Sequence, residues 1–190
     1  MPVPLKRKAF TLIELLIVVT VIAILASVAV VNLLEAQTRA KVSRVKNDLR
    51  ILATALEAYR NDNQGYPDLI DIATGGAWLL KPLTTPVAYL SVLPPDPFLP
   101  PIVPEFLYGR RMTYRYTSYP IPPDPATLWS LASNGPDLRN DTQGVYLGYS
   151  PELFTGAHPV LRDWVLYDPT NGTVSRGDLF RARDFVPSNW

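Results

Sequence analysis

The stretch Lys6-Arg7-Lys8-Ala9-Phe10-Thr11-Leu12-Ile13-Glu14 leads directly into an apolar run over residues 15–31. These 17 residues carry no charge, and only Thr20 and Ser27 among them are polar. Extended to residues 10–34 the segment has 25 residues, more than the roughly 20 that a bilayer-spanning helix needs. A secretory signal peptide has a shorter apolar core with a small-residue cleavage site after it, whereas here the basic residues and a possible cleavage point both lie before the apolar run. The pattern therefore predicts a membrane helix that stays attached to the rest of the chain.

Glu14 is the unusual residue of this helix, because a carboxylate among apolar residues is costly unless it is paired or neutralised. One interpretation is an acid at the helix end whose side chain reaches the lipid headgroups. The other is that a positive group from another molecule pairs with it. The residues alone leave both interpretations open.

The sequence Phe10-Thr11-Leu12-Ile13-Glu14 after a Lys/Arg-rich leader resembles the class III signal sequence of type IV prepilins and type II secretion pseudopilins. The resemblance implies that a membrane-bound prepilin peptidase cleaves on the cytoplasmic side, between Ala9 and Phe10, and methylates the new amine of Phe10. It also implies that Glu14, the fifth residue after cleavage, neutralises the amino terminus of a neighbouring subunit. The chain departs from the family at Ala9, where Gly is usual.

The helix is expected to continue beyond the membrane segment, because residues 35–60 contain no Pro or Gly. Apolar residues recur there in steps of three and four, which is the period of an amphipathic helix. The stripe consists of Val42, Val45, Leu49, Leu52, Leu56 and Tyr59. Fewer than three heptads make a coiled coil the weaker alternative, so we expect the stripe to lie under a small sheet. The opposite face is predicted to be solvated or to contact other subunits; it carries Arg44, Lys46, Asp48, Arg50 and Glu57.

The predicted helix runs from about Phe10 to Asn61, because turn residues at 61–65 and Pro67 mark its end. The expected organisation is a leader over residues 1–9, a transmembrane and assembly helix over 10–34, an amphipathic half of the same helix over 35–62, and a globular head over 63–190.

Strand signals in the head predict a small antiparallel sheet. Residues 113–119 and 127–132 are two β-prone runs, and residues 160–167 are a third candidate. Asn171-Gly172 is a hairpin turn signal that follows the third candidate. We therefore expect an α+β, pilin-like fold, with the long N-terminal helix packed on three or four antiparallel strands.

A proline-rich loop is predicted over residues 94–125, since 13 of the 20 prolines fall between Pro82 and Pro136. A polyproline partner ligand is one interpretation, but the apolar neighbours of these prolines favour packing. Residues 68–83 are predicted to form one or two short helices. Leu93-Pro94-Pro95-Asp96-Pro97-Phe98 resembles the Leu-Pro-x-Asp-Pro-aromatic turn of the major pseudopilin, and residues 59–67 resemble its helix-to-loop junction.

Residues 131–141 resemble the Ser-Leu-Gly-x-Asp-Gly loop that binds calcium in major pseudopilins. The resemblance implies Ca²⁺ bound by hard oxygen ligands, which are Asn134, Asp137, Asn140, Asp141 and the carbonyl of Leu131. The same residue types also form ordinary turns without a metal, and the sequence leaves both readings open. The chain has no cysteine, so no disulfide closes this loop.

Other classes of function are disfavoured by composition and motifs. His158 is the one histidine, so a zinc site with two histidines is excluded. The chain has no Gly-x-Ser-x-Gly elbow and no phosphate-binding loop. Without the leader it has 15 basic against 17 acidic residues, which is not a nucleic-acid footprint. We expect no enzyme activity and no nucleic-acid partner.

The resemblance implies a structural subunit of a pilus-like filament in type II protein secretion. Its implied partners are copies of itself, the prepilin peptidase, an assembly ATPase, an inner-membrane platform protein and minor pseudopilins. The subunit is expected to cross the inner membrane once, with its head on the periplasmic side. Basic residues flank both ends of the span, so this orientation depends on the leader motif rather than on charge. Two alternatives are a type IV pilin for adhesion, motility or DNA uptake, and a membrane-tethered binding domain.

Overall fold

We describe a computed structural model of the 190-residue chain. The described residues are 10–68, 80–99, 113–119, 126–139, 166–168, 170, 175 and 177–183. The chain divides into two compact units, Met1–Thr38 and Arg39–Trp190. Several predictions fall on residues outside the described ranges, among them the leader over residues 1–9, the hairpin signal Asn171-Gly172, and His158.

The long helix α1 spans Leu12–Asn63, two residues later at each end than the sequence predicts. It begins after Thr11, whose side chain caps the first turn. At its other end, the amide of Asn63 donates to the carbonyl of Tyr59 at 2.9 Å, and Gln64 adopts a left-handed φ of 59°. Such a left-handed residue after the last turn is a common way for a helix to stop.

The first unit contains the apolar half of α1, whose large side chains are 49–88% exposed between Leu12 and Leu34. By length and composition, α1 is the described helix that qualifies to cross a membrane. The two polar side chains of residues 15–31 are satisfied within the helix. Thr20 donates to the carbonyl of Leu16 at 2.8 Å, and Ser27 donates to that of Ile24 at 2.7 Å. Such internal bonding suits a lipid environment, where water cannot pair with a hydroxyl.

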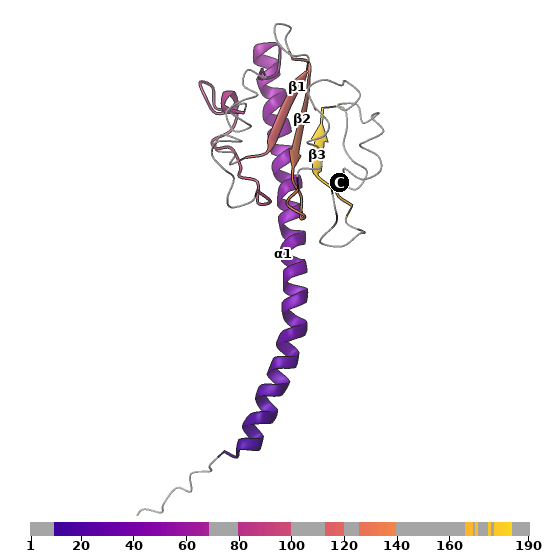
Figure 1. The fold of residues 1–190 in the computed structure, drawn as a ribbon. Helices are drawn as coiled ribbons and strands as arrows, with labels where there is room; N and C mark the ends of the chain where they lie inside the picture. Colours follow the sequence, from indigo (N-terminus) through magenta and orange to yellow (C-terminus); the bar gives the residue numbers. More distant parts are fainter. Residues whose placement is uncertain are drawn as a thin grey trace, which may run out of the picture. The chain divides into compact units, whose positions relative to one another are not determined.

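The second unit is the head, in which the later half of α1 lies along a three-stranded sheet (Figure 1). The predicted stripe is confirmed: its five aliphatic members are at most 6% exposed, and Tyr59 is partly buried. Small residues Ala53 and Ala55 are buried beside them. Removing this apolar surface from water is the main force that joins helix and sheet.

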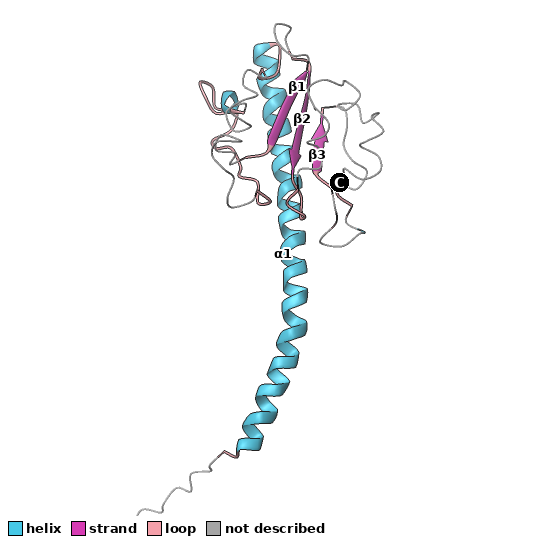
Figure 2. Cartoon of the chain, viewed as in Figure 1, coloured by secondary structure: helices cyan, strands magenta, loops and turns pink. Residues whose placement is uncertain are grey.

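The sheet consists of β1 (Arg115–Tyr119), β2 (Leu128–Ser133) and β3 (Leu179–Ala182) (Figure 2). The order is β1-β2-β3 with antiparallel neighbours, so β2 is central. The first two strands match the predicted runs to within two residues. The third does not, because β3 lies in a segment that the sequence analysis left unassigned.

The candidate strand over residues 160–167 lies outside the described residues except for its last two. There Leu166 forms an isolated parallel bridge with Asp178, rather than part of a named strand. Of the helices predicted over residues 68–83, the described part contains the 3₁₀ helix η1, Lys81–Leu83. Of the proline-rich loop, residues 94–99 and 113–119 are described.

The core of the head joins all of these elements. Trp129 of β2, Tyr114 before β1 and Phe180 of β3 are the largest fully buried side chains. Leu80 and Leu83, from the segment around η1, are also fully buried. The turn that resembles the pseudopilin motif contributes Phe98, which is 3% exposed.

Candidate functional site

Glu14 lies in the first turn of α1 and forms a reciprocal capping box with Thr11. The backbone N–H and the hydroxyl of Thr11 donate to Oε2 of Glu14 at 2.9 and 2.8 Å. In return, the N–H of Glu14 donates to the hydroxyl of Thr11 at 3.3 Å. The carboxylate thus lies at the positive end of the helix dipole, where a negative charge is favoured.

The sequence analysis singled out Glu14 but missed Thr11. The signal was present, because Thr-x-x-Glu before an apolar run is the sequence signature of a capping box. Phe10 is 84% exposed, and Glu14 is exposed as well, so both are accessible to a second chain. Ala9 lies outside the described residues.

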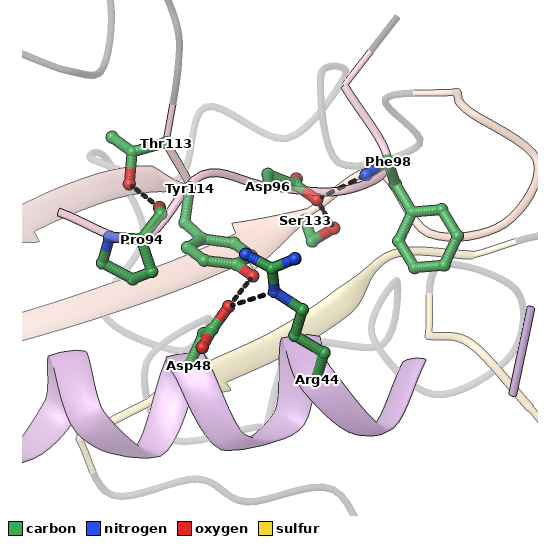
Figure 3. Close-up of polar contacts among 8 residues, drawn as sticks. All are labelled: Arg44, Asp48, Pro94, Asp96, Phe98, Thr113, Tyr114 and Ser133. Carbon is green, nitrogen blue, oxygen red and sulfur yellow. Dashed lines mark hydrogen bonds and ion pairs between the residues drawn. The ribbon is translucent and has the colours of Figure 1, made fainter. Parts of the chain in front are cut away.

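In the head, the helix and the start of the sheet are joined by a polar contact (Figure 3). The hydroxyl of Tyr114 donates to Oδ2 of Asp48 at 2.8 Å, and Nε of Arg44 lies 3.6 Å from the same oxygen. Asp48 was predicted to be solvated or to contact other subunits; the solvated alternative is wrong, because this residue is only 8% exposed and bonds to Tyr114 of its own chain. Burial, together with the hydrogen bond to Asp48, raises the pKa of Tyr114 far above its usual value.

Asp96 connects two motifs that the sequence analysis treated separately. Its Oδ1 accepts the N–H of Phe98 at 2.9 Å, within its own turn, and the hydroxyl of Ser133 at 2.8 Å, from the end of β2 (Figure 3). Burial raises the pKa of Asp96, while these hydrogen bonds and the nearby Arg115 oppose the rise.

A buried ion pair lies close to this contact. Arg115 of β1 and Asp178, just before β3, approach to 2.5 Å, with side chains 11% and 0% exposed. Next to it, the backbones of Gly135 and Gly177 meet so closely that a Cβ on Gly135 would lie 2.5 Å from the carbonyl oxygen of Gly177. Gly135 also has a φ of 72°, which favours glycine. The loop that follows β2 is therefore held from two sides.

Two of the five predicted calcium ligands lie in the same turn. Asn134 and Asp137 lie in the turn after β2, where Oδ1 of Asp137 accepts the N–H of Arg139 at 3.1 Å. Leu131 lies inside β2 and faces Tyr116 on one side and Arg181 on the other, so its carbonyl belongs to the ladder.

The other two predicted ligands, Asn140 and Asp141, lie outside the described residues. Among the residues that are described, no group of three or more His, Cys, Asp or Glu side chains is arranged to hold a metal. Calcium binding thus stays a prediction.

A second polar cluster surrounds Glu57 near the end of α1. Its carboxylate accepts the hydroxyl of Tyr66 at 2.8 and 2.9 Å and the indole N–H of Trp129 at 2.9 Å. The guanidinium of Arg60 lies 5.5 Å from the centre of the Tyr66 ring. Burial and the Glu57 carboxylate raise the pKa of Tyr66 to about 12. Glu57 was predicted to be solvated; it is exposed, but it also orders two core aromatics.

Comparison with known proteins adds a motif and several relatives. Residues 4–30 match the prokaryotic N-terminal methylation motif. The chain is 31% identical over 143 residues to type II secretion system core protein G of Pseudomonas aeruginosa, covering 72% of this chain and 90% of the relative. It is 32% identical over 103 residues to the Escherichia coli core protein G, covering 49% of this chain and 68% of the relative.

A type IV major pilin, PilA of Myxococcus xanthus, is 41% identical over 63 residues, which are 33% of this chain and 29% of the pilin. No solved structure gives a significant match. The similarity to the Pseudomonas protein, unlike that to the pilin, extends through most of both chains. The methylation motif, the long helix on a small antiparallel sheet and this extended similarity lead to one conclusion: the chain belongs to the type II secretion core protein G family of pseudopilins.

Proposed function

We propose that this chain is the structural subunit of a pilus-like filament that serves type II protein secretion. The observation that carries the proposal is the apolar half of α1, whose large side chains are at least 49% exposed. A helix that is apolar on all sides needs either lipid or other helices around it. The methylation motif at the same position and the core protein G relatives support the filament as its destination.

The proposed processing makes the mature chain begin at Phe10. A prepilin peptidase would cleave between Ala9 and Phe10 on the cytoplasmic side and methylate the new amine. The subunit would then wait in the inner membrane as a single-span protein with its head in the periplasm. The methylation motif, which covers residues 4–30, supports this order of events.

Assembly would move the apolar helix from lipid into a bundle of helices. Because lipid is already apolar, this transfer gains little hydrophobic energy, and packing and polar pairs must decide the register. We propose that Glu14 pairs with the methylated amine of Phe10 in a neighbouring subunit, which gives the carboxylate the partner that a buried charge requires. Thr11 supports this role, because its two hydrogen bonds aim the carboxylate toward the start of the helix.

The implied partners are further copies of this chain, minor pseudopilins, an assembly ATPase and its inner-membrane platform protein. The role is structural, and no chemical reaction is proposed for the described residues. A type IV pilin is the second candidate, favoured by the 41% identity to the Myxococcus pilin over 63 residues. A membrane-tethered binding domain is the third, and it predicts no assembly after cleavage. Deleting the gene separates the first two: loss of secretion supports the pseudopilin, and loss of surface fibres or motility supports the pilin.

The test of the assembly role compares Glu14→Gln with Glu35→Gln. Both replace an acid of α1 by its neutral isostere, but only the first removes the proposed partner of Phe10. With the complete secretion system present, we expect sheared filaments from the wild type and Glu35→Gln and none from Glu14→Gln. Normal filaments from Glu14→Gln would contradict the pairing.

We further propose that the loop after β2 binds calcium through Asn134, Asp137, Asn140 and Asp141. The described part of this set fits the ion's chemistry, since two oxygen-bearing side chains share a turn whose reversal depends on Gly135. When bound, the ion would stiffen the loop. Titration calorimetry of the detergent-solubilised chain with Ca²⁺ should give a binding heat that Asp137→Ala abolishes. Absence of heat from the wild type would contradict calcium binding.

A further inference from the structure

We propose that Asp96 is the positioning residue of the 134–139 loop, fixing the start of that loop through Ser133, the last residue of β2, whether or not a metal is bound. The inference deepens the proposed function, since this loop is the proposed calcium site, but its physical basis is independent of any ion. It assigns a role to the Pro94-Pro95-Asp96-Pro97 turn, which the sequence presents only as a rigid connection.

The turn is built to hold the Asp96 carboxylate still. Pro95 and Pro97 flank it, so the backbone φ is fixed on both sides, and the residue before a proline is itself restricted to extended conformations. The N–H of Phe98 donates to Oδ1 at 2.9 Å and closes a local Asx turn. Thr113 holds the turn at a second point, because its hydroxyl donates to the carbonyl of Pro94 at 2.8 Å. Thr113 also forms a bridge with Pro95.

The held carboxylate then acts on the loop. Oδ1 of Asp96 accepts the hydroxyl of Ser133 at 2.8 Å, across 37 residues of sequence. A hydrogen bond to a charged group contributes about twice as much as a neutral one, and Asp96 is only 7% exposed, so water competes little. The position of the junction between β2 and the loop is therefore fixed by Asp96, which belongs to neither element.

The start of the loop is also held from the opposite side, by backbone contact. Gly135 lies against Gly177, and the next residue, Asp178, is fixed by the buried ion pair with Arg115. Arg115 is also close enough to Asp96 to lower the pKa of its carboxyl. The start of the loop thus lies between the rigid proline turn of Asp96 and the segment before β3 that the ion pair holds. Neither contact uses one of the four side chains proposed as calcium ligands.

The test is hydrogen–deuterium exchange of the full chain in detergent with a calcium chelator present. Ser133→Ala removes the hydroxyl that donates to Asp96 and that also accepts the N–H of Gly135 at 3.5 Å. The readout is therefore the amides of residues 137–139, whose exchange should rise about tenfold, with amides of β1 unchanged. Asp96→Ala should raise it further, whereas Asp96→Asn keeps an acceptor oxygen and should have the smaller effect. Asp168→Ala is the matched control, because Asp168 makes a similar Asx turn whose hydrogen-bond partner among the described residues is Thr170, two residues away.

The outcomes are distinct. Faster exchange that includes residues 137–139 in Ser133→Ala but spares β1, with the Asp168 control unchanged, supports the positioning role. Unchanged exchange in Ser133→Ala, or an equal rise in β1, overturns it, and this holds even if Asp96→Ala fails to fold. A final comparison adds Ca²⁺ to the wild type: if the ion protects nothing, the calcium proposal fails, while the chelator result still decides the role of Asp96.

Discussion

The hydroxyl of Tyr114 donates a hydrogen bond of 2.8 Å to Asp48, linking the entry of β1 to α1 across 66 residues of sequence. The tyrosine is 0% exposed and the aspartate 8%. This polar contact lies beside the apolar stripe of α1. A hydrogen bond, unlike an apolar contact, depends on direction, so it fixes where the helix lies on the sheet. A helix can slide on an apolar surface at little cost, but it cannot slide away from a buried hydrogen bond.

Removing this hydroxyl should destabilise the head. In Tyr114→Phe, Asp48 stays buried with one partner fewer, so we expect the free energy of unfolding to fall by about 1–3 kcal/mol. Urea denaturation of the solubilised chain measures it. The control is Tyr89→Phe, which removes a hydroxyl bonded to Asp62 at the same 2.8 Å but at an exposed site. Equal effects of the two substitutions would contradict the importance of burial at Asp48.

The helix could be predicted from the sequence because its signals are local. The absence of Pro and Gly over residues 35–60, the three-four spacing of the stripe and the turn residues after Asn61 are all read within one segment. The strands over 115–119 and 128–133 were predicted for the same reason. β3 was missed because Leu179–Ala182 has four residues and carries Arg181, which is too short a run for an alternation to stand out. This segment forms a strand because its backbone pairs with the edge of β2.

The candidate sites also divide into those with a local sequence signal and those that depend on distant contacts. Glu14 could be found because a charge in an apolar run is conspicuous on its own. The burial of Asp48 and the role of Asp96 could not, because each depends on a partner far along the chain, Tyr114 or Ser133. A carboxylate on a helix or in a turn looks solvated until the fold supplies its donors.

The titration of Tyr66 tests the cluster around Glu57. The pKa of Tyr66 is raised to about 12 from an ordinary value of 10.0, so its contribution to stability is complete below pH 10 and is lost as the pH rises toward 12. NMR of ring-labelled tyrosine measures this pKa. Glu57→Gln should lower it, although not to 10, because burial is the larger cause of the shift and remains. An unchanged pKa would contradict the contact with Glu57.

Asp96 should give the head a measurable pH dependence. Burial raises its pKa above the ordinary 3.8, so its contribution is complete below that value and is lost as the pH rises through the raised pKa. The free energy of unfolding of the wild type, minus that of Asp96→Asn, should therefore decrease as the pH rises from about 3 to 7. Urea denaturation across this range measures it. A difference that grows with pH would mean that the carboxylate is stabilised in its charged form.

The most direct test of the central claim is the mass of the mature amino terminus. Protein isolated from a host with an active prepilin peptidase should begin at Phe10 and carry one methyl group on its α-amine. Only such a chain places a positive end one helical turn from Glu14. A chain that keeps residues 1–9, or that begins elsewhere, would contradict the account.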